Sequence, residues 1–309
     1  MVDDTAVADA APHRPIMLAQ VLEHLRPVPG ETVVDCTLGG GGHARAILDR
    51  LQPGGRLIGL DVDPLELPAT EVRLREAGFG PAALIVQRHN FRDLPDVLAG
   101  QAIRAVDGIL VDLGVSSMQH DTPSRGFSYK LPGPLDLRMD PGSGLPAWQR
   151  LAGLDQTALA AALSDYADEP HARLIAGLLV EARPRTTHAL ERIVRLGLAE
   201  HVPTVPRAEV KMSVRRTFQA LRILVNDELS ALDALLAALP ACLAPAGRVV
   251  VLTFHSGEDR RVKHALRAGL RDGTYSAIAD AVVRSARDET FSNRRAASAK
   301  LRWAVRADT

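Results

Sequence analysis

The chain has 309 residues, 46% hydrophobic and 24% charged, with two cysteines and a formal net charge of zero. This composition predicts a soluble globular protein with one large domain or two smaller ones, and it excludes a disulfide framework. No apolar run reaches the roughly 20 residues that span a bilayer. The acidic, alanine-rich stretch 1–12 resembles neither a signal nor a transit peptide. We therefore predict a cytoplasmic protein without membrane contact and with a disordered tail over 1–12.

The zero net charge is an average over unlike segments. Residues 1–120 carry 10 Lys and Arg against 16 Asp and Glu, whereas residues 183–222 carry 9 against 3 and residues 260–309 carry 12 against 5. This asymmetry predicts a basic face for a polyanion on a protein that is neutral overall. Ordinary solvated helix faces are the alternative, and composition leaves both open.

The first part of the chain alternates apolar strands with helical runs. We predict strands over 32–35, 56–60, 82–86 and 106–113, and helices over 17–25, 44–51 and 65–77. Strands separated in this way indicate a parallel α/β sheet.

The alternation then breaks. Residues 120–146 are rich in Pro, Gly and charge without any period, and helical patterns follow over 157–164, 170–183, 187–199 and 214–239, before a strand returns over 247–254. A helical block between strands of one sheet indicates an insertion. We predict a core formed by 13–120 and 213–309, with an inserted helical substrate-recognition domain over 121–212.

The most informative stretch is the βαβ unit over 32–63. Its first strand ends at Asp35, four glycines follow at 39–42, and the second strand leads to Asp61. Glycine lets the backbone turn tightly and approach a ligand, and a helix N-terminus presents unpaired N–H groups. An acid after the second strand can accept hydrogen bonds from ribose hydroxyls. The order predicts an adenosine-type cofactor.

The glycine loop leaves two cofactors open. Gly39-x-Gly41-x-x-Ala44 fits the loose dinucleotide fingerprint of NAD enzymes. Asp35, however, suits the α-ammonium group of S-adenosylmethionine and would repel a pyrophosphate, because like charges at close range are costly. The loop therefore favours S-adenosylmethionine.

Ligands of open α/β sheets bind outside the carboxyl ends of the strands. Here those ends carry Asp35, Asp61, Phe91, Asp112 and His255. We expect Asp112 to lie near the transferable methyl and to accept a hydrogen bond from an amine substrate, although capping a turn is its alternative role. Phe91 is expected to stack on adenine, with a place in the core as the alternative.

The last predicted strand is followed by a polar cluster that contains His255 and Ser256. We expect a role in the site for this cluster, and its spacing does not predict a metal site. Cys36 lies beside the glycine loop and Cys242 lies far from every strand end. A thiolate nucleophile, which methyl transfer to cytosine C5 requires, is therefore not expected, and methylation at nitrogen or oxygen is favoured.

Several blocks of sequence recur in one known family. They are HRPIM (13–17), DCTLGGGGHARAIL (35–48), GLDVDP (59–64), VDGILVDLGVSSMQ (106–119), RGFSY (125–129), GPLDLRMD (133–140), RTFQALRILVNDEL (216–229) and FHSGEDRRVK (254–263). In these blocks the chain resembles the cytosine-N4-specific ribosomal RNA small-subunit methyltransferase H family.

The resemblance implies a class I, Rossmann-like methyltransferase sheet with an inserted α-helical domain. It implies N4-methylation of a cytidine in the decoding region of 16S rRNA, within an assembled 30S-type particle, with the base out of its stack. Asp112 would orient the amine, and His255 and Ser256 would help place the base. The implied S-adenosylmethionine contacts, with Asp35 added from the loop, are Asp35, Gly40, Gly41, Gly42, His43, Asp61, Phe91, Asp112 and Gln119. The RNA-contact candidates are Arg138, Arg215, Arg216 and Arg260.

The chain departs from the family pattern on the substrate side. Gly257 stands where the family has Leu, Met212-Ser213-Val214 stands where it has a Pro-Ala pair, and Ala167-Asp168-Glu169 stands for Gly-Glu-Glu. A divergent paralogue acting on another RNA or a small molecule, or a non-catalytic ribosome-assembly factor, therefore remains an alternative.

Overall fold

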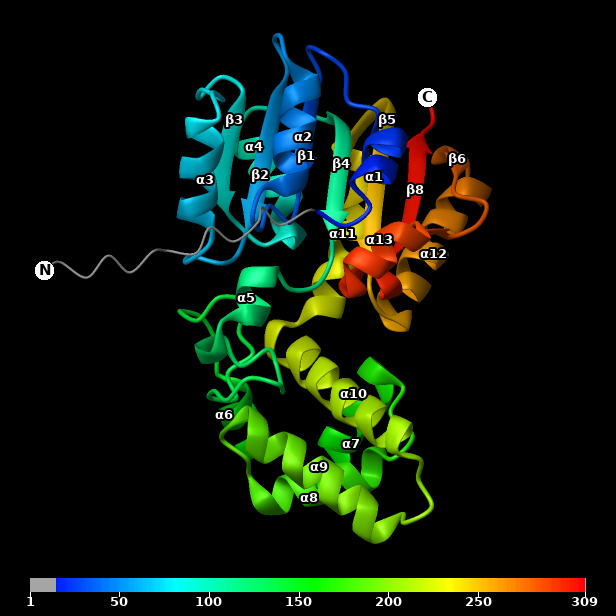
Figure 1. Ribbon diagram of the computed structural model, residues 1–309. Coiled ribbons are helices and arrows are strands. Elements are labelled where there is room, and N and C mark those ends of the chain that lie inside the picture. The colour runs from blue at the N-terminus through cyan, green and yellow to red at the C-terminus, as the bar shows by residue number, and fades with distance from the viewer. Residues whose placement is uncertain (1–14, 309) are drawn as a thin grey trace, which may run out of the picture.

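The computed structural model describes residues 15–308. A mixed β-sheet lies between two layers of helices, and a separate helical unit adjoins the carboxyl ends of its parallel strands (Figure 1). The predicted tail over 1–12 lies outside the described residues. None of the described helices is both long and apolar enough to cross a bilayer.

The sheet has the strand order β3-β2-β1-β4-β5-β8-β6, and β7 pairs with β8. The strands are β1 (Thr32–Asp35), β2 (Arg56–Asp61), β3 (Leu84–Arg88), β4 (Val106–Asp112), β5 (Leu243–Thr253), β6 (Tyr275–Ile278), β7 (Val283–Arg284) and β8 (Lys300–Arg306). β1 to β5 are parallel and β8 is antiparallel to β5. The class I, Rossmann-like sheet is thus confirmed. Its order reverses between β1 and β4, which is where such sheets bind ligands.

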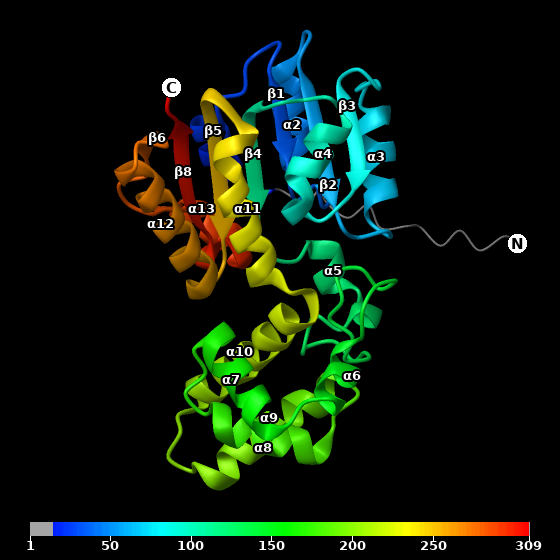
Figure 2. The same ribbon diagram turned by 180° about the vertical axis from the view of Figure 1, so that it is seen from behind.

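Helices cover both faces of the sheet because neighbouring strand residues point to opposite sides. Val33 belongs to the apolar cluster on the side covered by α1 (Leu18–Leu25), α2 (Gly42–Leu51) and α3 (Leu67–Glu76). Figure 1 shows these three helices on one face of the sheet. Val34 packs with α4 (Leu94–Gly100), α11 (Glu228–Cys242) and α12 (Ser256–Arg271), which Figure 2 shows from behind.

The helical unit is inserted between β4 and β5 and has a hydrophobic core of its own. Its helices are α6 (Ala147–Ala152), α7 (Gln156–Ala167), α8 (Ala172–Ala182), α9 (Thr187–His201) and α10 (Arg207–Asn226), and α5 (Ser117–Asp121) leads into it. The boundary expected at 212/213 falls inside α10, whose Val214, Phe218 and Leu221 are buried in this unit. The unit therefore extends to Asn226.

Two further parts of the sequence fold differently from the prediction. The helical run over 214–239 is interrupted at Asp227, whose φ of 51° separates α10 from α11. Beyond β5, the sheet gains β6, β7 and β8, which were not predicted, and α13 (Arg287–Ser292) and a 3₁₀ turn (Arg294–Ser298) precede β8.

Candidate active site

The glycine loop turns tightly between β1 and α2. Gly41 caps α2 with a φ of 78°, and a Cβ there would lie 2.8 Å from Cγ2 of Thr70. Both facts require glycine, because side chains are strained at this φ. A Cβ on Gly40 would meet nothing closer than 3.9 Å, so this position has open space in front of it. The loop presents its backbone, and the first N–H groups of the ten-residue α2, to a ligand.

Asp61, at the end of β2, fixes this loop. Its Oδ2 accepts the N–H of Gly39 at 2.8 Å and its Oδ1 accepts the N–H of Asp63 at 2.9 Å. Burial raises its pKa. Each oxygen keeps a second lone pair, so the carboxylate can still accept a ribose hydroxyl.

Asp35, at the end of β1, is almost fully buried beside Asp61. Burial, with the nearby charge of Asp61, raises its pKa to about 7, although it accepts the N–H of Thr37 at 3.1 Å. Ionisation of such an acid is favoured by a nearby cation. The position therefore suits the ammonium group for which the sequence predicted it.

Asp112 ends β4, two residues beyond Leu110, which pairs with Asp35 across the switch point. One carboxylate oxygen, Oδ1, is buried and accepts no hydrogen bond within the described part of the chain, while 27% of the side-chain surface stays accessible. Burial, then the charges of Asp35 and Glu258, raises its pKa to about 8. Because buried acceptors are normally satisfied, this spare capacity marks a place for a ligand donor.

His43 holds Asp112 in place from α2. Its Nε2 lies 3.0 Å from the carbonyl of Ile16, and because a carbonyl can only accept, Nε2 carries the hydrogen. Its Nδ1 faces Oδ2 of Asp112 at 3.5 Å. The buried ring thus connects the helix that follows the glycines to the carboxylate of β4.

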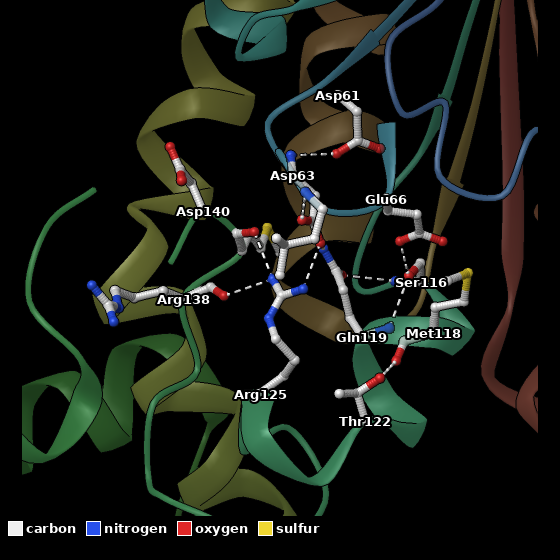
Figure 3. Close-up of polar contacts among 12 residues, drawn as sticks. Asp61, Asp63, Glu66, Ser116, Met118, Gln119, Thr122, Arg125, Arg138 and Asp140 are labelled. Atoms are coloured by element: carbon white, nitrogen blue, oxygen red, sulfur yellow. Dashed lines mark hydrogen bonds and ion pairs between the residues drawn. The ribbon is translucent and has the colours of Figure 1, made fainter. Parts of the chain in front are cut away.

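A second polar network joins the loop after β2 to the start of the helical unit (Figure 3). Arg125 donates from Nη1 to Oδ2 of the fully buried Asp63 at 2.7 Å, and Nε2 of Gln119 donates to the same oxygen at 2.8 Å. The amide oxygen of Gln119 accepts the N–H of Ser116 at 3.0 Å in a capping box. Gln119, predicted as a cofactor contact, therefore has a structural role as well.

His255 is the N-cap residue of α12. Its Nδ1 accepts the N–H of Glu258 at 3.4 Å, and its Nε2 lies 3.0 Å from Oε1 of the same side chain. Burial alone would raise the pKa of Glu258, but the bond from His255 and the charge of Arg222 lower it. Nδ1 is thus used in capping α12, whereas the buried Nε2 makes no hydrogen bond of good geometry to a described residue. Placing a base remains a prediction for His255.

Ser256 and Arg260 connect the core to the helical unit instead of pointing freely into the crevice. Oγ of Ser256 donates to Asp168 at 2.8 Å, and Nη2 of Arg260 donates to the same carboxylate at 3.2 Å. Asp168 ends α7 with a φ of 50°. Ser256 and Arg260 therefore bind α12 of the core to the C-terminal end of α7 through Asp168.

Comparison with known proteins decides which family this site belongs to. The model of the MraW methylase family matches residues 10–307. The chain belongs to the MraW methylase family.

Relatives support the assignment over nearly the whole chain. The chain is 42% identical to Ribosomal RNA small subunit methyltransferase H 1 of Agathobacter rectalis, over 97% of this chain and 86% of the relative. It is 43% identical to Ribosomal RNA small subunit methyltransferase H of Anaeromyxobacter sp. strain K, over 94% of this chain and 96% of the relative. The chain is therefore an S-adenosylmethionine-dependent methyltransferase, as predicted.

The remaining predicted residues of this methylase lie apart from the strand-end acids. Phe91 begins a 3₁₀ turn after β3 and packs partly against the core, so stacking on adenine stays a prediction. Arg138 is held by Asp136 through two bonds of 2.8 Å, and Arg216 donates to Glu209 at 2.5 Å. Of the four arginines predicted to contact RNA, only Arg215 is exposed without an ion pair to a described residue.

Sequence reasoning missed the residues that support the methylase site. Oγ1 of Thr37 accepts the N–H of Asp112 at 2.7 Å, and Glu66 accepts the hydroxyl of Ser116 at 2.5 Å. Asp63 and Arg125 were missed as well. Both lie in quoted family blocks, and the pairing of a buried acid with a distant arginine is not visible in the order of residues.

Proposed function

We propose that this enzyme transfers a methyl group from S-adenosylmethionine to N4 of a cytidine in the decoding region of small-subunit rRNA. The substrate is an assembled 30S-type particle, and the enzyme accordingly acts in the cytoplasm. The RNA substrate is supported by the names of two relatives, which are small-subunit rRNA methyltransferases and match this chain over 86% and 96% of their own length. The observation that carries the reaction is the partly open carboxylate of Asp112 beside the glycine loop.

The residues present fit S-adenosylmethionine. The cofactor is cationic at its ammonium and sulfonium groups, and Asp35, Asp61 and Asp112 are three acids whose pKa burial raises. A bound cation relieves the cost of ionising them together. Asp35 would hold the ammonium group, Asp61 the ribose hydroxyls, and the backbone at Gly40 would approach the cofactor closely. When bound, the cofactor supplies the electrophilic methyl group.

Asp112 would do the chemical work on the substrate side. The exocyclic amine of cytosine is a poor nucleophile because its lone pair is delocalised into the ring. An ionised Asp112 that accepts a hydrogen bond from this amine localises the lone pair towards the methyl group, and it then takes the proton that the methylated amine releases. The place of Asp112 at the end of β4, where its N–H donates to Thr37, fixes its orientation and lowers the barrier further.

The test is methyl transfer from radiolabelled S-adenosylmethionine to undermethylated small subunits, in parallel with naked 16S rRNA. Mass spectrometry then identifies the labelled nucleoside, with Asp112→Asn as the inactive control. We expect N4-methylcytidine on the particle and little label on naked RNA. Label in another nucleoside, or none on either RNA although the cofactor binds, would reject this function in favour of the divergent paralogue.

A further inference from the structure

The segment before β8 borders the active site. Lys300, which begins β8, pairs with Thr253, the last residue of β5, so residues 287–298 lie at the carboxyl edge of the sheet. Oε1 of Glu289, on α13, accepts the N–H of Met17 at 2.6 Å, next to the Ile16 carbonyl that binds His43. Figure 1 shows α13 at this edge, on the side of the helical unit.

The same segment is also bound to α5, which follows β4. Nη2 of Arg295 donates to Oδ1 of Asp121 at 2.6 Å, and Nη1 donates to the hydroxyl of Ser117. The segment is therefore anchored at both ends, to the chain before α1 and to α5. The chain before α1 contacts His43 through the carbonyl of Ile16, and α5 follows Asp112 in the sequence.

Phe291, on α13, projects from this anchored segment into solvent. It is 93% exposed, more than any other large hydrophobic side chain of the described residues. Phe291 lies two positions after Glu289, and residues at this spacing on a helix face different directions. Because Glu289 faces Met17, the anchoring contact turns the ring outwards. A single exposed apolar residue is ordinary, so its surroundings decide its meaning.

Exposed arginines precede and follow Phe291 in the sequence, and Asp288 is the exposed acid among them. Arg284, Arg287 and Arg294 are exposed, and none of them forms an ion pair with a described residue. Three of the four arginines predicted to bind RNA, in contrast, are held by acids of the protein itself. An exposed aromatic ring, flanked in the sequence by exposed arginines that form no ion pair with a described residue, is a composition typical of surfaces that bind single-stranded nucleic acid.

We propose that Phe291, Arg287 and Arg294 form a binding surface for an unpaired nucleotide next to the target cytidine. A base stacks on the ring of Phe291, and the two arginines contact the flanking phosphates. The proposal rests on the proposed function, because a target base that leaves its stack exposes its neighbours for such contacts. It assigns RNA contacts to residues that were not among the predicted ones.

The test measures binding of undermethylated small subunits and of a naked rRNA fragment containing the target cytidine. Variants are Phe291→Ala, Phe291→Trp and, as a control, Leu270→Ala, an exposed residue at the far end of α12. Stacking predicts about tenfold weaker binding of both RNAs by Phe291→Ala, with near-normal binding by Phe291→Trp and Leu270→Ala. S-adenosylmethionine affinity should be unchanged in all three variants.

Salt dependence tests the arginines separately. Arg287→Ala and Arg294→Ala should each lower the slope of log affinity against log salt by about one. Binding by Phe291→Ala within twofold of the wild type would overturn the proposal. So would weaker binding of particles alone, which would indicate contact with a ribosomal protein. Failure of the proposed function is distinguishable, because it is read from the nucleoside that the wild-type enzyme methylates.

Discussion

Arg125 and Asp63 form a buried ion pair, with 2.7 Å between Nη1 and Oδ2, that joins the start of the helical unit to the loop after β2. The other guanidinium nitrogen, Nη2, donates to the carbonyls of Arg138 and Met139 at 3.1 and 2.7 Å. One side chain therefore connects three segments that the sequence separates. Asp63 lies two residues after Asp61, whose carboxylate accepts the N–H of Gly39. The ion pair is therefore coupled to the glycine loop through this short stretch of chain.

Replacing Arg125 by Ala should strongly destabilise the protein. The change leaves Asp63 buried without its charged partner, which costs about 3–5 kcal/mol of unfolding free energy. Urea denaturation measures this, with Arg195→Ala as the control because Arg195 is exposed and its salt bridge is to Glu191 on the same helix. The control should lose no more than about 0.5 kcal/mol. A loss below 1 kcal/mol in Arg125→Ala would show that the pair is not a structural junction.

The two middle glycines of the loop should respond differently to alanine. Gly41→Ala combines a φ of 78° with a 2.8 Å approach to Thr70, and we expect it to lower the free energy of unfolding by about 1–3 kcal/mol. Gly40→Ala has free space and should stay within about 1 kcal/mol of the wild type. Thermal unfolding of the two variants without cofactor provides the comparison. Equal effects would contradict the assigned loop geometry.

Asp112→Asn should remove most of the catalytic rate and leave cofactor binding in place. General-base catalysis contributes about 10²–10⁴-fold, so we expect kcat to fall by a factor in this range. Because burial raises the pKa of Asp112 to about 8, only the minority of wild-type molecules that are ionised at pH 7 can accept the proton. Wild-type kcat/KM for S-adenosylmethionine, which reports the pKa of the free enzyme, should therefore increase with pH and level off above about 8. The residual activity of Asp112→Asn should lack this increase. If both proteins show the same pH profile, the titrating group is a residue other than Asp112.

Asp35 should make the protein less stable as the pH rises. Its pKa of about 7 in the folded protein is above the 3.8 of an unperturbed carboxyl, so the folded state binds the proton more tightly. Its stabilising contribution is complete below pH 4 and is lost as the pH rises through 7. The difference in unfolding free energy between wild type and Asp35→Asn should shift by about 4 kcal/mol over this interval.

Urea denaturation at several pH values between 4 and 8 measures that difference. Asp49→Asn, which changes an exposed acid on α2, controls for the substitution itself. The stability of the wild type minus that of Asp35→Asn should decrease as the pH rises. An increase would show that the pKa of Asp35 is lowered by folding, not raised. Because a bound ammonium group favours the ionised acid, S-adenosylmethionine should also release protons when it binds near pH 6.

Local pattern was sufficient to predict the glycine loop and the strand-end acids. Asp35, Asp61 and Asp112 end apolar strands, and parallel strands bring their carboxyl ends to one edge of the sheet. The role of His255 was harder to read. H-x-x-E over 255–258 has the spacing of a capping box, in which a side chain binds the third residue of the helix. The cap, which uses Nδ1 of His255, could have been weighed against a catalytic role.

The rest of the fold depends on contacts that sequence order does not reveal. β8 has charged residues at 300, 302 and 306 among apolar ones, and Arg302 is accommodated near the core by Asp259 at 2.7 Å. That partner lies 43 residues away. The boundary of the helical unit was misplaced for a similar reason, since α10 continues without interruption from 207 to 226 and only its packing shows where it belongs.

The place of the insertion has a consequence for the order of folding during synthesis. β1 to β4 are complete at residue 112, whereas β5 does not begin until residue 243, so these parallel strands emerge from the ribosome well before their last parallel neighbour. The crevice between β1 and β4 needs only early contacts, and the helical unit can gather around its own core afterwards. Pairing of β4 with β5 joins distant residues and is the slow, late event. Until then the free edge of β4 is open to wrong partners, so the nascent chain acquires its cofactor crevice before it is protected from aggregation.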